Sequence, residues 1–290
     1  MKAIRNLITT LVVVVAILGV VIIGGYIYVR TTYGIDLFRT AEQLKTLTQA
    51  VDENALCPNA FGEEDFAAME TELNKKFDGF VSHEEGKGFN GYSVNFGALA
   101  GKSMSGTISL TEKQVGAITQ TVFYVQTGGK IKIGEKEVSV TVVQVDFSEI
   151  AANGSADFNV VAKIDLTPFK ADMGEFPYKY FKKYIPDNFY VSSTVRVDKT
   201  EKDGFSYTVT HKSLTLNNLS ADDTADLFNT MSAVLKIGTA ENLNMQIGET
   251  AVNALIGTAE NSGFAYSMKA IGATAFRFET ASDAERFVVN

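Results

Sequence analysis

The stretch Val138-Ser-Val-Thr-Val-Val-Gln-Val-Asp-Phe147 decides the fold class of this 290-residue chain. Valine alternates with polar residues as far as Val142, and the alternation then shifts by one residue to Val143 and Val145. Strict alternation is typical of a strand with one buried face, and a one-residue shift is how a β-bulge shows in a sequence. The stretch therefore predicts a long strand with a bulge near its middle.

Three later stretches repeat this alternation. Residues 158–166 and 189–197 each place apolar side chains on one side and polar side chains on the other. Residues 205–216 follow the same scheme, with a second shift in parity between Val209 and Leu214. Long strands with bulges predict a curved antiparallel sheet that is apolar inside and polar outside.

Segments with helical spacing precede and interrupt the predicted sheet. Residues 36–51 and 63–77 carry apolar side chains at helical spacing. Thr111 and Gln114 form a capping box, which predicts a helix that starts there and continues beyond Val122. The sequence therefore predicts an α+β protein, in which helices pack on one face of a long, curved antiparallel sheet.

The N-terminal segment is predicted to be a transmembrane helix. Residues 11–23 contain no polar side chain, and the whole segment of residues 7–29 is about 34 Å long as a helix, enough to span a bilayer core of ~30 Å. Lys2 and Arg5 precede it, which favours a cytoplasmic N-terminus. Its end lacks the small-residue pattern of a signal-peptide cleavage site, so we expect an uncleaved anchor.

This anchor divides the chain into four predicted parts. Residues 1–6 are a cytoplasmic stub, and residues 7–29 are the anchor. Residues 30–106 form a juxtamembrane helical region, and residues 107–290 form a β-rich extracytoplasmic domain. We therefore expect a single-pass protein of the cell membrane whose C-terminal part is extracytoplasmic.

Two segments of the β-rich part are similar in sequence. At a constant offset of 137 residues, Ile108 and Ile118 align with Met245 and Leu255. We interpret both segments as a strand followed by a helix, with the second helix starting at Gly248. This recurrence suggests two related halves, and the sequence leaves open whether they arose by internal duplication.

Composition and motifs disfavour several function classes. From residue 31 onward, 23 basic and 34 acidic side chains give a net charge of -11, which disfavours a nucleic-acid partner. Cys57 is the single cysteine and is interpreted as a structural thiol. The only histidines, His83 and His211, lack metal-ligand spacing around them, and no nucleophile-elbow or phosphate-loop motif occurs. We therefore expect no metal, no cofactor and no enzymatic activity.

Residues 176–185 combine aromatic rings with lysines in an otherwise acidic region. Rings flanked by lysines favour a membrane surface or the mouth of a lipid pocket, because the long lysine side chains reach toward water. The alternative interpretation is a short helix that closes the end of the sheet, with solvated lysines.

The strand-to-helix segment of residues 108–118, its echo at residues 247–255 and the stretch of residues 185–191 together resemble a known family. With a single N-terminal anchor, they are similar to the YpmS-like family of membrane-anchored extracytoplasmic proteins of Gram-positive bacteria. That family looks distantly like tubular lipid-binding domains, in which a long sheet curls around a helix and holds acyl chains. The resemblance covers about residues 107–255 and implies no catalytic residues.

The leading hypothesis is therefore a non-catalytic protein that binds lipid or another apolar ligand beside the membrane. The predicted groove on the concave face of the sheet is lined by Val115, Ile118, Val252 and Leu255. The predicted opening is formed by Phe176, Tyr180, Phe181 and Tyr184. The alternative is a structural or protein-interaction module of the bacterial cell envelope, with no ligand pocket.

The anchor generates the first testable prediction. The mature protein should keep its N-terminal residues and stay in the membrane fraction after a carbonate wash, because residues 7–29 lack a cleavage site. Mass spectrometry of the mature N-terminus checks this, and a mature protein that starts near Thr31 would contradict it.

Overall fold

The computed structural model describes residues 37–133, 136–168, 186–200, 203–235, 239–260, 263–282 and 284–290. The predicted anchor, residues 7–29, lies outside these ranges. Within them, no helix combines the length and the apolar character needed to cross a bilayer.

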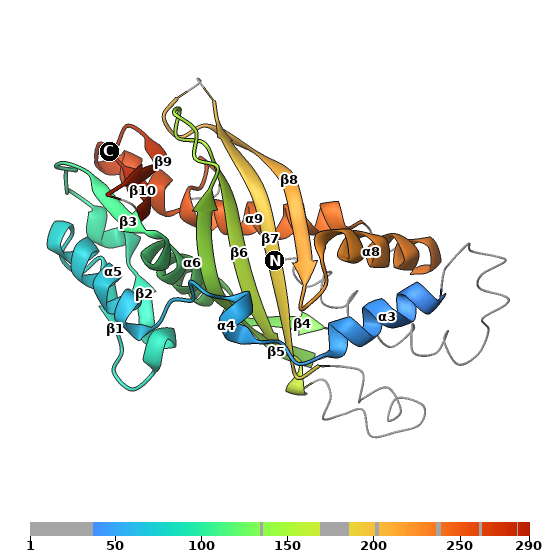
Figure 1. The fold of residues 1–290 in the computed structure, drawn as a ribbon. Helices are drawn as coiled ribbons and strands as arrows, with labels where there is room; N and C mark the ends of the chain where they lie inside the picture. Colours follow the sequence, from blue (N-terminus) through green and yellow to red (C-terminus); the bar gives the residue numbers. More distant parts are fainter. Residues whose placement is uncertain are drawn as a thin grey trace.

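A five-stranded antiparallel sheet forms the centre of the fold (Figure 1). Its order is β4-β5-β6-β7-β8, so each strand pairs with its neighbour in the sequence. The strands are β4 (Lys130–Ile133), β5 (Lys136–Ser148), β6 (Ala156–Asp165), β7 (Asn188–Lys199) and β8 (Tyr207–Leu216). The predicted combination of helices with a long antiparallel sheet is confirmed.

Both predicted bulges are present in this sheet. The β5–β6 register shifts between Val142 and Gln144, which leaves Val143 as the extra residue on β5. The β7–β8 register shifts at Thr194 and Val195, which leaves Lys212 as the extra residue on β8. At each bulge the extra residue shifts by one position which residues of the strand point inward. The apolar residues shift by one position at the same place, so the inner face stays apolar along the whole sheet.

Helices flank the sheet, and α3, α5 and α6 lie where the apolar spacing predicts them. They are α3 (Leu37–Thr48), α4 (Glu53–Leu56), α5 (Glu63–Lys76), α6 (Glu112–Thr127), α8 (Ala221–Leu235), α9 (Ala240–Leu255) and α10 (Phe264–Met268), with 3-10 turns η1 (Gly88–Gly91), η2 (Phe96–Leu99) and η5 (Lys269–Ile271). The predicted capping box starts α6: the Thr111 hydroxyl accepts from the Gln114 N–H, and the Gln114 side chain accepts from the Thr111 N–H. Gly128 ends α6 in the left-handed conformation, at φ 68°.

Two smaller sheets complete the fold. Strand β1 (Val81–His83) pairs with β2 (Tyr92–Val94). Strand β10 (Ala284–Val289) lies between β3 (Ile108–Thr111) and β9 (Phe276–Ala281). The end of the chain therefore pairs with the strand that leads into α6, a long-range contact that the sequence pattern does not reveal.

The predicted helix start at Gly248 is wrong. Helix α9 begins at Ala240, where the Thr239 hydroxyl accepts from the Asn242 N–H, so Met245 is helical and its predicted counterpart Ile108 lies in a strand. Gly248 instead marks a close helix–sheet contact. A Cβ atom there would lie 2.2 Å from a methyl group of Val195, which only glycine avoids.

One continuous apolar core joins most of the described chain. It includes Leu47 of α3, the inner faces of α5, α6 and α9, the inner face of the large sheet, and Val289 of β10. The predicted boundary between residues 106 and 107 therefore does not separate two cores. Residues on both sides of it bury their apolar surface together, which is the largest favourable term in folding.

Candidate functional site

The four residues predicted to line a ligand groove lie inside the core. Val115 and Ile118 of α6 and Val252 and Leu255 of α9 each have 0% of their surface exposed. A side chain that lines a groove is touched by solvent or ligand, so full burial means that neighbouring protein atoms fill the space around these four. The structure thus brings the four predicted residues together in a packed interior.

The four residues predicted to form the opening lie outside the described residues. They are Phe176, Tyr180, Phe181 and Tyr184. They contribute nothing to the geometry of the site that follows.

Two hollows on the surface are lined by other residues. One, of about 580 Å³, lies between η2 and α10, beside Phe96, Tyr266 and Lys269. The other, of about 610 Å³, lies beside His83 and Tyr124 at the end of α6. Among the described residues, no group of three or more His, Cys, Asp or Glu side chains is placed to hold a metal ion.

The free edge of β5 is covered by side chains of α6. Strand β4 pairs with β5 only as far as Ser139, so the rest of β5 needs other partners for its outward N–H groups. The buried Gln120 side chain accepts from the Val142 N–H at 2.7 Å, beside the bulge. The Glu112 carboxylate accepts from the Phe147 N–H. Helix α6 thus replaces a missing strand.

Helix α9 likewise contributes a side chain that forms hydrogen bonds at the second bulge. The amide nitrogen of the fully buried Asn244 donates to the Thr194 carbonyl and to Nδ1 of His211, both at 2.7 Å. The hydroxyl of Ser193 donates to the amide oxygen of Asn244, also at 2.7 Å. His211 is therefore held by a structural hydrogen bond at the bulge, and each inner helix fixes one bulge through a buried amide.

A partly buried polar cluster surrounds Asn59 where the chain crosses the edge of β5. The amide nitrogen of Asn59 donates to Glu112 and to Asp146, each at 3.1 Å. The side chain of Gln144 accepts from the Asn59 N–H at 3.0 Å and donates to Asp146. The pKa of Glu112 is raised to about 7, chiefly by burial and also by the negative charges of Asp146 and Glu285, while the hydrogen bonds from Phe147 and Asn59 oppose the shift.

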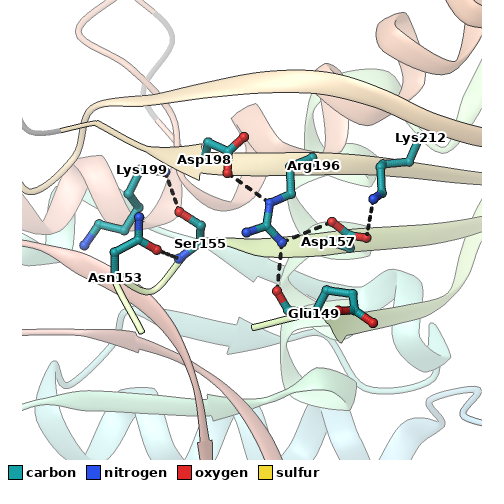
Figure 2. A network of polar contacts seen from close by, with 8 residues as sticks. All are labelled: Glu149, Asn153, Ser155, Asp157, Arg196, Asp198, Lys199 and Lys212. Atoms are coloured by element: carbon teal, nitrogen blue, oxygen red, sulfur yellow. Dashed lines mark hydrogen bonds and ion pairs between the residues drawn. The ribbon is translucent and has the colours of Figure 1, made fainter. Parts of the chain in front are cut away.

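The opposite face of the sheet carries an ordered polar network (Figure 2). Asp157 of β6 lies opposite Arg196 of β7, and the guanidinium donates to the Asp157 carboxylate at 3.2 Å and to Asp198 at 2.9 Å. The same guanidinium donates to the carbonyl of Glu149, and Lys212 pairs with Asp157 at 3.3 Å. The Asp157 side chain is only 7% exposed, so its pairs are partly desolvated and hold these strands in register.

Further hydrogen bonds extend this network along the same face. The Asn159 amide donates to Ser192 at 2.8 Å and to Thr194 at 2.9 Å. We define the outer polar face as Asp157, Asn159, Ser192, Thr194, Arg196, Asp198 and Lys212. Apart from Asp157, its side chains are half-buried or exposed.

Helix α4 covers the apolar part of this same face, beside the outer polar face (Figure 1). Leu56 and Cys57 pack against Val161 of β6 and Tyr190 of β7. Burial raises the pKa of the Cys57 thiol to about 11. The thiol therefore stays protonated at neutral pH, which fits the predicted structural role better than a nucleophile.

The sequence pattern does not reveal that the residues around Asn59 form a cluster. Glu112 occupies the first turn of α6, where a carboxylate is expected on local grounds alone. Asp146 looks like an ordinary polar residue of an alternating strand, and Asn59 lies far from both in sequence. Only the tertiary contact between the three segments reveals the cluster.

No protein-family model, no curated protein and no solved structure matches this chain. The resemblance to the YpmS-like family therefore stays a prediction.

Glu112 generates a prediction about pH and stability. Its folded-state pKa of about 7 lies above the ordinary value of 4.5, so folding binds a proton; this stabilisation is complete below pH 4.5 and is lost as pH rises through 7. The free energy of unfolding of wild type, relative to Glu112→Gln, should fall by roughly 1–2 kcal/mol between pH 4.5 and 8, allowing for the partial exposure of Glu112. Urea unfolding of both proteins checks this, and parallel pH profiles would contradict it.

Proposed function

We propose that this chain is a non-catalytic protein-interaction module of the bacterial cell envelope, held at the membrane by residues 7–29. The observation that carries this proposal is the full burial of Val115, Ile118, Val252 and Leu255. An acyl chain needs an elongated apolar cavity. These four side chains fill the space in which the sequence predicts that cavity. The filled interior favours a rigid module over a lipid carrier.

Opening the interior to a lipid would break well-satisfied buried contacts. Helix α6 would have to release the hydrogen bond from the Val142 N–H to Gln120. Helix α9 would have to release Asn244 from Thr194, and separate Gly248 from Val195. Each buried polar group left without a partner costs about 1–3 kcal/mol, so the closed state is strongly favoured.

The outer polar face supports binding of a protein partner. Its side chains are held by cross-strand bonds, such as those from Asn159 to Ser192 and from Arg196 to Asp157. Side chains that are already ordered lose less conformational entropy on binding. Arginine is also enriched at protein interfaces, so Arg196 is a suitable centre for such a contact.

One experiment separates the filled module from a lipid carrier. The test protein is the fragment of residues 37–290, which retains the continuous core, and the variant is Ile118→Trp. We expect the wild-type fragment to carry no co-purified lipid in native mass spectrometry. Ile118→Trp should lower its free energy of unfolding by about 1–3 kcal/mol, because a larger side chain overpacks a filled core.

The matched control is Val125→Trp on the same helix. Val125 is 56% exposed, so this change should leave stability within about 0.5 kcal/mol of wild type. A wild-type fragment with stoichiometric lipid, whose uptake Ile118→Trp abolishes without loss of stability, would establish the lipid carrier instead.

A second experiment tests the outer polar face directly. A photo-crosslinking amino acid at Thr194 of the full chain, in native membranes, should yield one discrete protein adduct. Arg196→Glu should reduce that adduct at least about tenfold, because it reverses the charge at the centre of the face. The same crosslinker at Val125 is the control. Equal adducts from both positions, or no effect of Arg196→Glu, would contradict a docking role.

A further inference from the structure

Residues 57–61 form a strap that runs from the outer face of the sheet, around the free edge of β5, to α6. At one end, Cys57 packs against Val161 and Tyr190. At the other end, the Phe61 ring lies directly on Gly116 of α6, where a Cβ atom would come within 2.3 Å of the ring.

The middle of the strap is held by the bulge of β5 and by two carboxylates. The Phe61 N–H donates to the carbonyl of Val143 at 3.3 Å, and the Asn59 N–H donates to Gln144 at 3.0 Å. The Asn59 side chain bridges Glu112 and Asp146. The strap therefore links two carboxylates that are only partly exposed.

We propose that the strap is a pH-gated latch, closed over β5 while the Glu112 carboxyl beside Asp146 is protonated and open when Glu112 is ionised. In the closed state, two ionised carboxylates repel each other in a partly desolvated site. Lifting the strap removes Asn59 from between them and lets water solvate both charges.

Burial and the charged and polar groups around Glu112 together raise its pKa in the closed strap. Strand β5 contributes the negative charge of Asp146, and β10 contributes that of Glu285. Strand β10 also carries Arg286, opposite Thr111 in its ladder with β3. The strap contributes the amide of Asn59, whose hydrogen bond to Glu112 favours the ionised form. The Phe147 N–H and the first turn of α6 favour the ionised form, but the burial of Glu112 outweighs them.

The size of the response follows from linkage between protonation and closure. In the closed strap the pKa of Glu112 is about 7. Solvation of the carboxylate on opening lowers this pKa toward the ordinary value of 4.5. The ratio of closed to open strap then falls by at most about 300-fold between pH 4.5 and pH 8. Opening would uncover Val161 and Tyr190 beside the outer polar face, which adds apolar area to that surface at alkaline pH.

Cys57 offers a direct readout, because it is the single cysteine of the chain and is 7% exposed in the closed strap. The experiment measures the rate at which 4,4′-dithiodipyridine modifies Cys57 in the full chain between pH 5 and 8. Wild type is compared with Glu112→Gln at each pH, so that the intrinsic pH dependence of thiol chemistry cancels in the ratio. We expect the ratio of wild-type to variant rates to rise at least about tenfold from pH 5 to pH 8.

A second variant and a second measurement complete the test. The ratio of the Asp146→Asn rate to the Glu112→Gln rate should rise less between pH 5 and pH 8 than the wild-type ratio does. Loss of the charge of Asp146 lowers the pKa of Glu112 in the closed state. If Glu112→Gln does not fold, hydrogen exchange of the Phe61 amide in wild type, normalised to that of Val160, should lose protection over the same pH range. A wild-type to variant ratio that is constant with pH, or constant Phe61 protection, would overturn the proposal.

Discussion

The capping of β5 by α6 is the constraint on which the rest of the structure depends. Strand β4 is too short to pair with all of β5, so the bulged half of β5 would expose unpaired N–H groups. Gln120 and Glu112 satisfy two of these groups, and this fixes α6 along the edge of the sheet. Helix α5 and strand β2 then pack on α6, and β10 joins the strand that leads into it. The N-terminal and C-terminal segments therefore share one core.

The same principle explains why the concave side is filled. Each inner helix approaches the sheet until a buried amide reaches a bulge: Gln120 at the β5 bulge and Asn244 at the β8 bulge. Such hydrogen bonds require close contact, and glycine permits it where Gly248 meets Val195. A helix held at this distance leaves no room for an acyl chain between itself and the strands. The interior is then a source of rigidity.

The opposite face shows a different balance of forces. Its upper part is polar and ordered by the pairs around Arg196, while its lower part is apolar and covered by α4 and Cys57 (Figures 1 and 2). The strap joins this cover to the edge of β5 at the cost of bringing Glu112 close to Asp146. Burial beside the negative charge of Asp146 raises the pKa of Glu112, and the hydrogen bond from Asn59 offsets this only in part. The cover of the outer face is therefore coupled to an electrostatic strain that pH controls.

The sequence by itself determined the elements whose signals are local. Alternation along residues 138–147 and 205–216 predicted two bulged strands, and Thr111 with Gln114 predicted the start of α6, because side-chain period and capping depend on neighbours in the chain. It misplaced the start of α9, because Gly248 resembles a helix boundary until its contact with Val195 is known. Tertiary structure alone decided that Val115 and Val252 lie in a filled core, and that Asn59, Glu112 and Asp146 meet. Packing density and the pKa of a buried acid depend on atoms brought together from distant segments, and no local pattern records them.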